Sequence, residues 1–591
     1  MILKALAEYY ERLANDPEAD VAPYGFEYKA IPFLIVVAKD GSFLNIRDMR
    51  QGEGKQKTAR EFCLPRGEKK ASGIKANLLW DNPQYVLGAP KSDAKKDVKK
   101  ARDALKAFQC RLTQDLADID DDGVNALKNF YDRKQLEQVA SHELFPEIMQ
   151  ENANLTFILD GDDMPVAQRA AITEKATSLF SRIRDGVEQR ASAISGKQDE
   201  AAILHAAIKG VWGAQTSGAN IVSFNDDAYC SYGKTKKDQG LNAPVGKHDE
   251  FAYTTALNRL LSKHSRQRMQ VGDASTVFWA KDSCDLESDL PSYLSPAKGE
   301  EAVSYGKIKS LLSAVRTGIP PEDGALPFYV LGLSPNASRI AVRFWYAGNV
   351  KEVKERLAQH FLDIAIVRGP HDPDYLSLFQ MLVATATEHK ADNIPPNLGG
   401  EFARSILSGT SYPRTLLANA IRRCKAEQKI DYARAAIIKG FLARNARLSN
   451  QTTKEVAMGL DREYDNIGYV LGRLFAVLER IQEQAQGRGL NKTIRDAYFG
   501  AAASSPLVTF KRLQDLAIHH LAKIRHAGKS AVWLEQQMQD VLGHVPPQGI
   551  PSILSLEDQG RFAIGYYHQR QEFFKKKEAG ETVNEEQGEE S

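Results

Sequence analysis

Three short motifs have the residue types of metal or phosphate chemistry. Asp160, Asp162 and Asp163 follow an apolar run, where a metal-dependent nuclease could place carboxylates, and His371-Asp372 has the residue pair of some phosphohydrolases. Gly233-Lys234-Thr235 has the ending of a phosphate-binding loop, but the earlier glycine of such a loop is missing. A two-metal site needs further His and Asp ligands at local spacing. We therefore expect no catalytic residue, no metal and no cofactor, and a nuclease using Asp160, Asp162, Asp163 and His371 is the alternative.

A cluster of basic residues between positions 55 and 75 has different chemistry. It holds seven cations against two acids, an excess of five, and phosphate is the natural counterpart of such a charge. Proline and glycine within it predict loops that approach a nucleic-acid backbone closely. We predict phosphate contacts by Lys55, Lys57 and Arg60. The residues expected to contact DNA near a base edge are Lys69, Lys70, Ser72, Lys75 and Asn77.

Two further loops carry polar or basic side chains. Residues 213–220 place amides and hydroxyls between glycines, which is the chemistry used at adenine edges and minor-groove acceptors. Gln215, Thr216 and Asn220 are the candidate DNA contacts there. An exposed basic loop adds phosphate contacts at Lys234, Lys236 and Lys237.

The most basic stretch lies in a helical region between positions 414 and 447. Nine cations there stand against Glu427 and Asp431 alone, an excess of seven. Cations at this density repel one another unless an anion neutralises them, so a bound polyanion is the economical explanation. The predicted phosphate contacts are Arg422, Arg423, Arg434, Arg444 and Arg447.

Hydrophobic periodicity indicates which elements position these side chains. Apolar residues at helical spacing predict a helix over 3–13, and an apolar run followed by Asp40-Gly41 predicts a strand over 31–37. Further strands are expected at 155–160, 220–224, 275–280, 327–332 and 340–346. Beyond position 350 the pattern is helical, and its clearest stripe runs from Ile467 to Ile481, with Arg473 and Arg480 elsewhere on the cylinder.

These elements predict an α+β chain with a mixed α/β domain over 1–346 and a helical basic region over 347–455. A helical bundle over 456–577 and a disordered acidic tail over 578–591 would follow, because the tail has almost no apolar content. The chain has 591 residues, too many for one hydrophobic core, which fits several domains.

Composition narrows the class of protein further. The 43% hydrophobic and 26% charged residues are those of a folded protein in water, and a net charge of +2 leaves nucleic-acid binding to be decided by local distribution. Five scattered cysteines without a C-x-x-C pair argue against zinc ribbons and disulfide frameworks. No apolar run reaches membrane-spanning length and no signal core is visible, so a cytoplasmic location without membrane insertion is expected.

Several stretches in order resemble the large subunit of subtype I-C CRISPR Cascade complexes, the Csd-type branch of the Cas-eight family. The likeness covers nearly the whole chain. It rests on Ile31-Pro32-Phe33, Ser72-Gly73-Ile74, Asn77-Leu78-Leu79-Trp80-Asp81-Asn82 and Gly213-Ala214-Gln215-Thr216-Ser217-Gly218-Ala219, and on residues 85–88, 222–225, 240–245, 251–258, 272–280 and 328–339.

The resemblance implies a non-catalytic subunit that binds near the 5′ end of the guide RNA (crRNA), beside Cas-five-type and Cas-seven-type subunits. Such a subunit inspects double-stranded DNA for a short protospacer-adjacent motif (PAM), helps to open it, supports the displaced single strand and docks a separate helicase-nuclease. On this reading the eight DNA-contacting candidates would be PAM contacts. The resemblance also implies a small subunit made from an internal start in the same gene, for which Met458 is the candidate.

Overall fold

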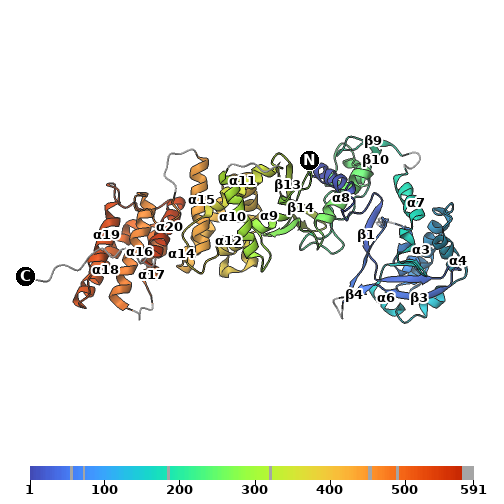
Figure 1. Cartoon of the computed structure of the whole chain (residues 1–591), viewed down its shortest axis with the longest axis horizontal. Coiled ribbons are helices and arrows are strands. Elements are labelled where there is room, and N and C mark those ends of the chain that lie inside the picture. The colour runs from blue at the N-terminus through green and yellow to red at the C-terminus, as the bar shows by residue number, and fades with distance from the viewer. Residues whose placement is uncertain are drawn as a thin grey trace, which may run out of the picture. The chain divides into compact units, whose positions relative to one another are not determined.

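The computed structural model describes residues 1–52, 57–68, 70, 73–182, 187–317, 323–449, 456–487 and 492–574 (Figure 1). The chain divides into two compact units. Unit 1 comprises Met1–Gly210, Ala214–Lys263 and Asn336–Ile340, and unit 2 comprises Val211–Gly213, His264–Pro335 and Ala341–Ser591. The predicted boundaries at 346 and 455 remain predictions, and the predicted tail at 578–591 lies outside the described residues.

A four-stranded mixed sheet with the order β3-β2-β8-β7 forms the centre of unit 1. All five residues of β2 (Phe33–Val37) are buried, as in a strand covered on both faces. Strand β8 (Leu155–Leu159) runs parallel to it, and β3 (Phe43–Asp48) and β7 (Trp80–Asp81) are antiparallel at the edges. The predicted strands at 31–37 and 155–160 are confirmed.

Helices of unit 1 cover this sheet through aromatic side chains. Phe108 of α3 (Lys95–Gln114) and Phe130 of α4 (Asp122–Asp132) place their ring centroids 6.4 and 5.7 Å from that of Phe157. The predicted first helix is α1 (Ile2–Ala14), which packs on α8 (Lys247–Leu260). The remaining elements are β1 (Phe26–Ala30), β4 (Arg50–Gln51), β5 (Thr58–Ala59), β6 (Glu61–Pro65), α2 (Pro83–Val86), α5 (Leu136–Ala140), α6 (Phe145–Glu151), α7 (Ala170–Ser181), β9 (Gln189–Ala191) and β10 (Gln198–Glu200).

Unit 2 begins with a second sheet, of order β11-β12-β13-β14. The predicted strands at 275–280, 327–332 and 340–346 are confirmed as parts of β12 (Ala274–Ala280), β13 (Pro327–Asn336) and β14 (Arg339–Asn349), and β11 (Arg268–Val271) joins them. The predicted strand at 220–224 is wrong. Within the described ranges, Asn220 forms an isolated bridge to Arg339, and no strand pairs with the residues after it.

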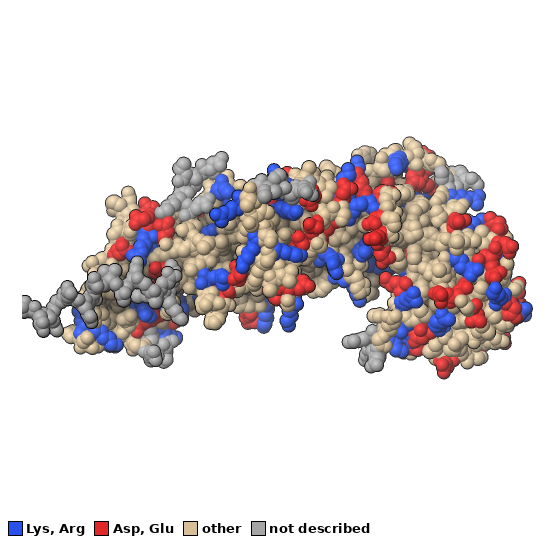
Figure 2. Space-filling model, in the orientation of Figure 1, with Lys and Arg blue, Asp and Glu red and all other residues tan. Residues whose placement is uncertain are grey.

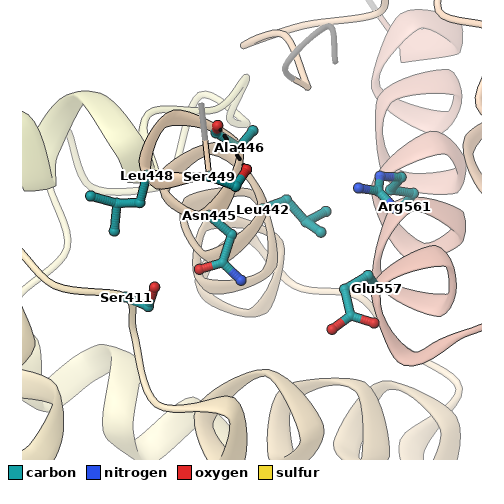
Figure 3. Close-up of a pocket in the computed structure, with 8 residues that line it drawn as sticks. All are labelled: Ser411, Leu442, Asn445, Ala446, Leu448, Ser449, Glu557 and Arg561. Atoms are coloured by element: carbon teal, nitrogen blue, oxygen red, sulfur yellow. Dashed lines mark hydrogen bonds between the residues drawn. The ribbon is translucent and has the colours of Figure 1, made fainter. Parts of the chain in front are cut away.

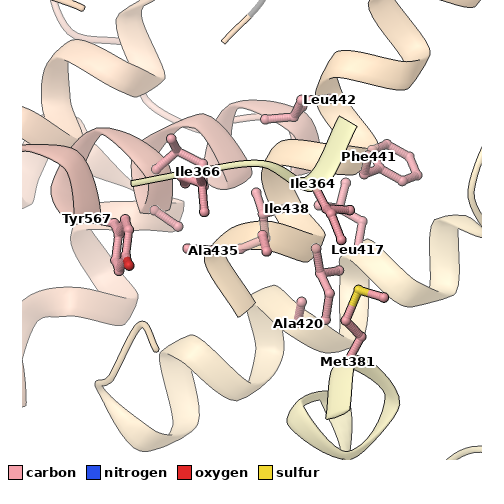
Figure 4. Packing of buried hydrophobic residues seen from close by; sticks show 14 of the residues in the cluster. Ile364, Ile366, Met381, Leu417, Ala420, Ala435, Ile438, Phe441, Leu442 and Tyr567 are labelled. Carbon is pink, nitrogen blue, oxygen red and sulfur yellow. The ribbon is translucent and has the colours of Figure 1, made fainter. Parts of the chain in front are cut away.

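After β14 the described residues of unit 2 are helical and share one core with the sheet. Buried side chains from Met269 to Tyr567 belong to a single cluster. Figure 4 shows a part of it, where Ile364 and Ile366 meet Ile438 and Leu417. Helices α9 (Leu286–Leu294) and α10 (Glu301–Thr317) lie between β12 and β13. The helices after β14 are α11 (Val350–Ile364), α12 (Leu378–Thr385), α13 (Leu398–Ser408), α14 (Arg414–Glu427), α15 (Tyr432–Leu448), α16 (Ile467–Gln486), α17 (Ile494–Ser504), α18 (Pro506–His526), α19 (Val532–Gly543) and α20 (Leu556–Phe574). The predicted fold class, mixed α/β followed by helices, is confirmed.

Helix α16 lies at the centre of the last helices and corresponds to the predicted stripe. It approaches α20 so closely that a Cβ atom built at Gly472 would lie 2.0 Å from the carbonyl oxygen of Phe562. Arg473 lies off the apolar stripe, as expected, but it is buried. Its guanidinium donates to Asp540, Gln569 and the Arg462 carbonyl, and burial lowers its pKa. The polar side of α16 at Arg473 is therefore buried by neighbouring elements and does not face solvent.

Candidate nucleic-acid interface

The first predicted DNA-contacting loop is fastened at its base by buried side chains. Asn77, predicted to contact a base, is only 4% exposed, and its side-chain oxygen accepts a 2.8 Å hydrogen bond from the Glu68 amide. The Trp80 indole donates to the Pro65 carbonyl at 2.7 Å, and Arg111 donates to the Ala76 carbonyl at 3.0 Å. Asn77 could contact a nucleobase only if these hydrogen bonds at the foot of the loop were broken.

Lys70, another predicted DNA contact, is held by an acid of the same loop. Its ammonium lies 2.6 Å from a carboxylate oxygen of the buried Asp81 and 3.6 Å from the ring centroid of Tyr85. Asp81 also accepts hydrogen bonds from the amides of Asn77 and Asn82. Burial lowers the pKa of Lys70. This lysine neutralises an internal carboxylate, so its charge is already compensated before any phosphate arrives.

Between these fastenings, Gly73, Ile74 and Lys75 form an exposed tip. Gly73 has a φ of +78° with open space around its Cα, a conformation that favours glycine. Ile74 and Lys75 are exposed, and no hydrogen bond or ion pair within the described residues engages the Lys75 ammonium. The tip thus presents a cation without a partner among the described residues, and an apolar side chain, beside hydrogen-bonded residues. Lys69 and Ser72 lie outside the described residues.

One buried carboxylate connects this loop with the second predicted loop. Glu250 of α8 pairs with both terminal nitrogens of Arg66 at 3.0 Å and accepts a 2.6 Å hydrogen bond from the Ala206 amide. The carbonyl of His205, the residue before Ala206, accepts a 3.2 Å hydrogen bond from the Asn220 side chain. The structure therefore fastens both loops to α8, an arrangement that the spacing of the residues could not predict.

In the second loop, two of the three predicted contacts are exposed. Gln215 and Thr216 are exposed on a turn closed by the hydrogen bond from the Gly218 amide to the Gln215 carbonyl, 2.9 Å long. Asn220 is half-buried, and its amide is used inside the fold. Of the three candidates in this loop, Gln215 and Thr216 can reach a base edge without rearrangement.

The predicted phosphate contacts of unit 1 differ in their exposure and in their ion pairs. Lys57, Arg60 and Lys237 are exposed, Lys234 is half-buried, and the Lys236 ammonium lies 3.7 Å from Asp227. In the phosphate-loop-like motif, Thr235 donates to Asp238 through its amide and its hydroxyl, and the element that follows is a four-residue 3₁₀ turn. Lys55 lies outside the described residues.

The basic stretch in α14 and α15 is mostly neutralised by acids of the same chain. Arg434 is fully buried and lies 2.6 Å from Glu427. Arg444 is 1% exposed and shares Asp363 of α11 with Arg447, which donates to both carboxylate oxygens. Arg423 also pairs with Glu427, at 2.6 Å.

Among the five predicted phosphate contacts of this stretch, Arg422 alone is exposed and has no partner within the described residues. Asp363 lies 51 residues before Arg414 in the sequence, so the local count could not include it. The charge excess is therefore no evidence for a polyanion at the buried arginines. Figure 2 shows basic and acidic side chains interspersed over the visible face.

The residues of the alternative hypothesis, a metal-dependent nuclease, do not form a metal site within the described residues. Asp162 pairs with Arg169, and Asp160 is an exposed residue just after β8. Over the described ranges, no group of three or more His, Cys, Asp or Glu side chains is arranged to hold a metal ion.

A cavity of about 400 Å³ lies between α15 and α20 (Figure 3). Its charged lining residues, Glu557 and Arg561, have opposite signs. The side-chain oxygen of Asn445, which also lines the cavity, is buried and has no hydrogen-bond partner among the described residues. With one acid and one base, the cavity has no excess of cations to hold a phosphate backbone.

Comparison with known proteins gives a match over nearly the whole chain. A family model described as CRISPR-associated protein (Cas_Csd1) matches residues 6–574. No curated protein matches the chain. None of the helices in the described parts of the chain is both long and apolar enough to cross a membrane.

Proposed function

The chain belongs to the Csd1 family of CRISPR-associated proteins, the large subunits of the type I-C Cascade complex, and we propose that it is the subunit that contacts the PAM duplex. The loop tip formed by Gly73, Ile74 and Lys75 supports this proposal most directly. It is exposed on a base fastened by Asn77, Lys70 and Asp81. A free cation on a preorganised support loses little conformational entropy when it binds a phosphate.

In this proposal the roles within the interface are divided. Lys75, Lys57 and Arg60 contact phosphates, and Gln215 and Thr216 read base edges from the second loop. Asn77 and Lys70 position the tip instead of touching DNA. A subunit of an RNA-guided complex needs only a few base contacts, because pairing with the guide supplies most of the sequence specificity.

The remaining parts of the proposal concern partners. The chain would bind crRNA near its 5′ end beside Cas-five-type and Cas-seven-type subunits, support the displaced strand and recruit the helicase-nuclease, without catalysis of its own. Translation from Met458 would give a separate small subunit. Met458 is exposed, but its carbonyl accepts a 2.7 Å hydrogen bond from the Val367 amide, and α20 packs on α14 and α15. A fragment beginning there would uncover this apolar surface of α20.

The test compares binding of guide-loaded complexes to duplexes with and without the PAM. Gln215→Ala should weaken binding to the PAM duplex by about 1–3 kcal/mol, the discrimination of one good base contact, and leave the PAM-less duplex nearly unchanged. Lys75→Ala should weaken both duplexes alike, because a phosphate contact carries no sequence information.

Lys197→Ala is the matched control for charge, since Lys197 is exposed in unit 1 and lies on neither loop. It should bind both duplexes like the parent protein. Equal losses on both duplexes with Gln215→Ala would refute the base-reading role, and unchanged binding with Lys75→Ala would refute the role of the tip.

A further inference from the structure

Helix α3 carries a row of cations that none of the predicted contacts includes. Successive residues of an α-helix are about 100° apart, so the spacing i, i+4, i+7, i+11 keeps side chains within roughly 60° of one another. Lys95, Lys99, Arg102 and Lys106 have this spacing. They extend along about 16 Å of the helix at 1.5 Å per residue. We call these four residues the α3 row.

The α3 row faces away from the core and is not neutralised. The helix buries a different stripe, formed by Ala101, Ala104, Phe108 and Leu112. All four cations are exposed, and within the described residues none of them has a hydrogen bond or an ion pair. By contrast, Arg111 of the same helix pairs with Asp115 at 2.7 Å.

Nearby acids do not offset the charge. Seven cations lie between positions 91 and 106 against three acids, an excess of four. One of these acids, Asp97, accepts a 2.6 Å hydrogen bond from the Ser92 hydroxyl. Lys96 and Lys100 add two more exposed cations beside the row, and neither has an ion pair in the part of the chain that the structure describes. The local field is therefore positive along the whole first half of the helix.

The positions of these cations destabilise helix α3. The helix begins at Lys95 after Ala94, which provides no side-chain cap, and the cations of its first turn, beside the single acid Asp97, oppose the helix macrodipole. Like charges at i and i+4 repel one another and destabilise a helix. Packing of the buried stripe offsets this destabilisation. A bound polyanion would remove both penalties, and such local violations concentrate at functional sites.

We propose that the α3 row binds the sugar-phosphate backbone of duplex DNA. The inference rests on the proposed function and adds a second contact that does not depend on the PAM. Arg111, on another face of α3, donates a hydrogen bond to the Ala76 carbonyl next to the loop tip, so the row and the tip are connected through α3. Proteins that hold single strands use aromatic side chains for stacking. The one aromatic residue of α3, Phe108, is buried, which favours a duplex.

The test measures duplex binding by the full chain as a function of salt concentration, by fluorescence anisotropy. Each phosphate contact contributes about 0.9 to the slope of log K against log salt. Lys99→Gln/Lys106→Gln should lower this slope by about 1.8, equally on PAM-bearing and PAM-less duplexes. The control Lys96→Gln/Lys100→Gln removes the same charge from the same helix beside the row and should lower the slope clearly less. Thermal unfolding should show that both double variants fold.

Four results would overturn the inference: equal slopes for the two double variants, an unchanged slope for the row variant, a loss only on single-stranded DNA or RNA of the same sequence, and a loss of assembly with partner subunits at unchanged duplex affinity. The last two would assign the row to another nucleic acid or to a protein. Failure of the proposed function is distinct, because it would abolish the parent protein's preference for the PAM duplex while leaving the contrast between the two variants intact.

Discussion

Helices α14 and α15 and helix α3 have the same kind of sequence, rich in cations and poor in acids, yet their side chains have opposite surroundings. In α15, Arg434 and Arg444 are buried against Glu427 and Asp363. In α3, Lys99 and Lys106 are exposed and unpaired within the described residues. A local excess of charge therefore indicates a polyanion only where the fold supplies no internal counterion. In this chain that condition favours unit 1 as the DNA-binding surface.

The largest expected loss of stability comes from removing the acid that neutralises the arginines of α15. Asp363→Asn should destabilise the protein by about 3–5 kcal/mol, because it leaves the buried Arg444 without its carboxylate. Urea unfolding followed by tryptophan fluorescence measures the loss.

A matched control for this variant is Asp374→Asn, which breaks the exposed pair with Arg368 and should cost about 0–1 kcal/mol. Similar small losses for both variants would mean that Arg444 is not held by Asp363, and the structural role assigned to the α15 arginines would fail.

A smaller effect comes from pH, because unit 2 also buries neutral histidines. Burial lowers the pKa of His360 to about 3 and that of His568 to about 4. In the unfolded chain both titrate near 6.5, so below this pH the unfolded state takes up more protons and stability falls. Between about pH 7.5 and 5.5 each histidine should remove about 1.4 kcal/mol.

Urea unfolding of the parent and of His568→Gln at these two pH values measures the effect. The variant should lose about 1.4 kcal/mol less than the parent. An identical loss would show that the pKa of His568 is not lowered in the folded protein.

The sequence predicted the elements better than the environments of their side chains. The strand at 31–37 followed from an apolar run before Asp40-Gly41, and the central helix followed from the stripe ending at Ile481. The segment 220–224 had the residue types of a strand, but strand formation also needs a neighbour, which the local sequence does not specify.

The candidate site was predictable only in part, for the same reason. Lys75 and Gln215 are exposed as expected, whereas Asn77 and Lys70 are used inside the loop. Asp81 and Glu250 were missed because a buried carboxylate in an apolar context has no sequence signature beyond its own polarity. The α3 row did have a signal, its lysines at helical spacing, which a helix wheel over 95–106 reveals.

The most direct test of this division between unit 1 and the α14–α15 region is lysine acetylation of the guide-loaded complex, with and without the PAM duplex, followed by mass spectrometry. Lys75, Lys99 and Lys106 are exposed in unit 1, and Lys429 is exposed between α14 and α15. We expect the duplex to protect the three lysines of unit 1 several-fold and to leave Lys429 unchanged. Protection of Lys429 with full reactivity at Lys75, Lys99 and Lys106 would contradict the account.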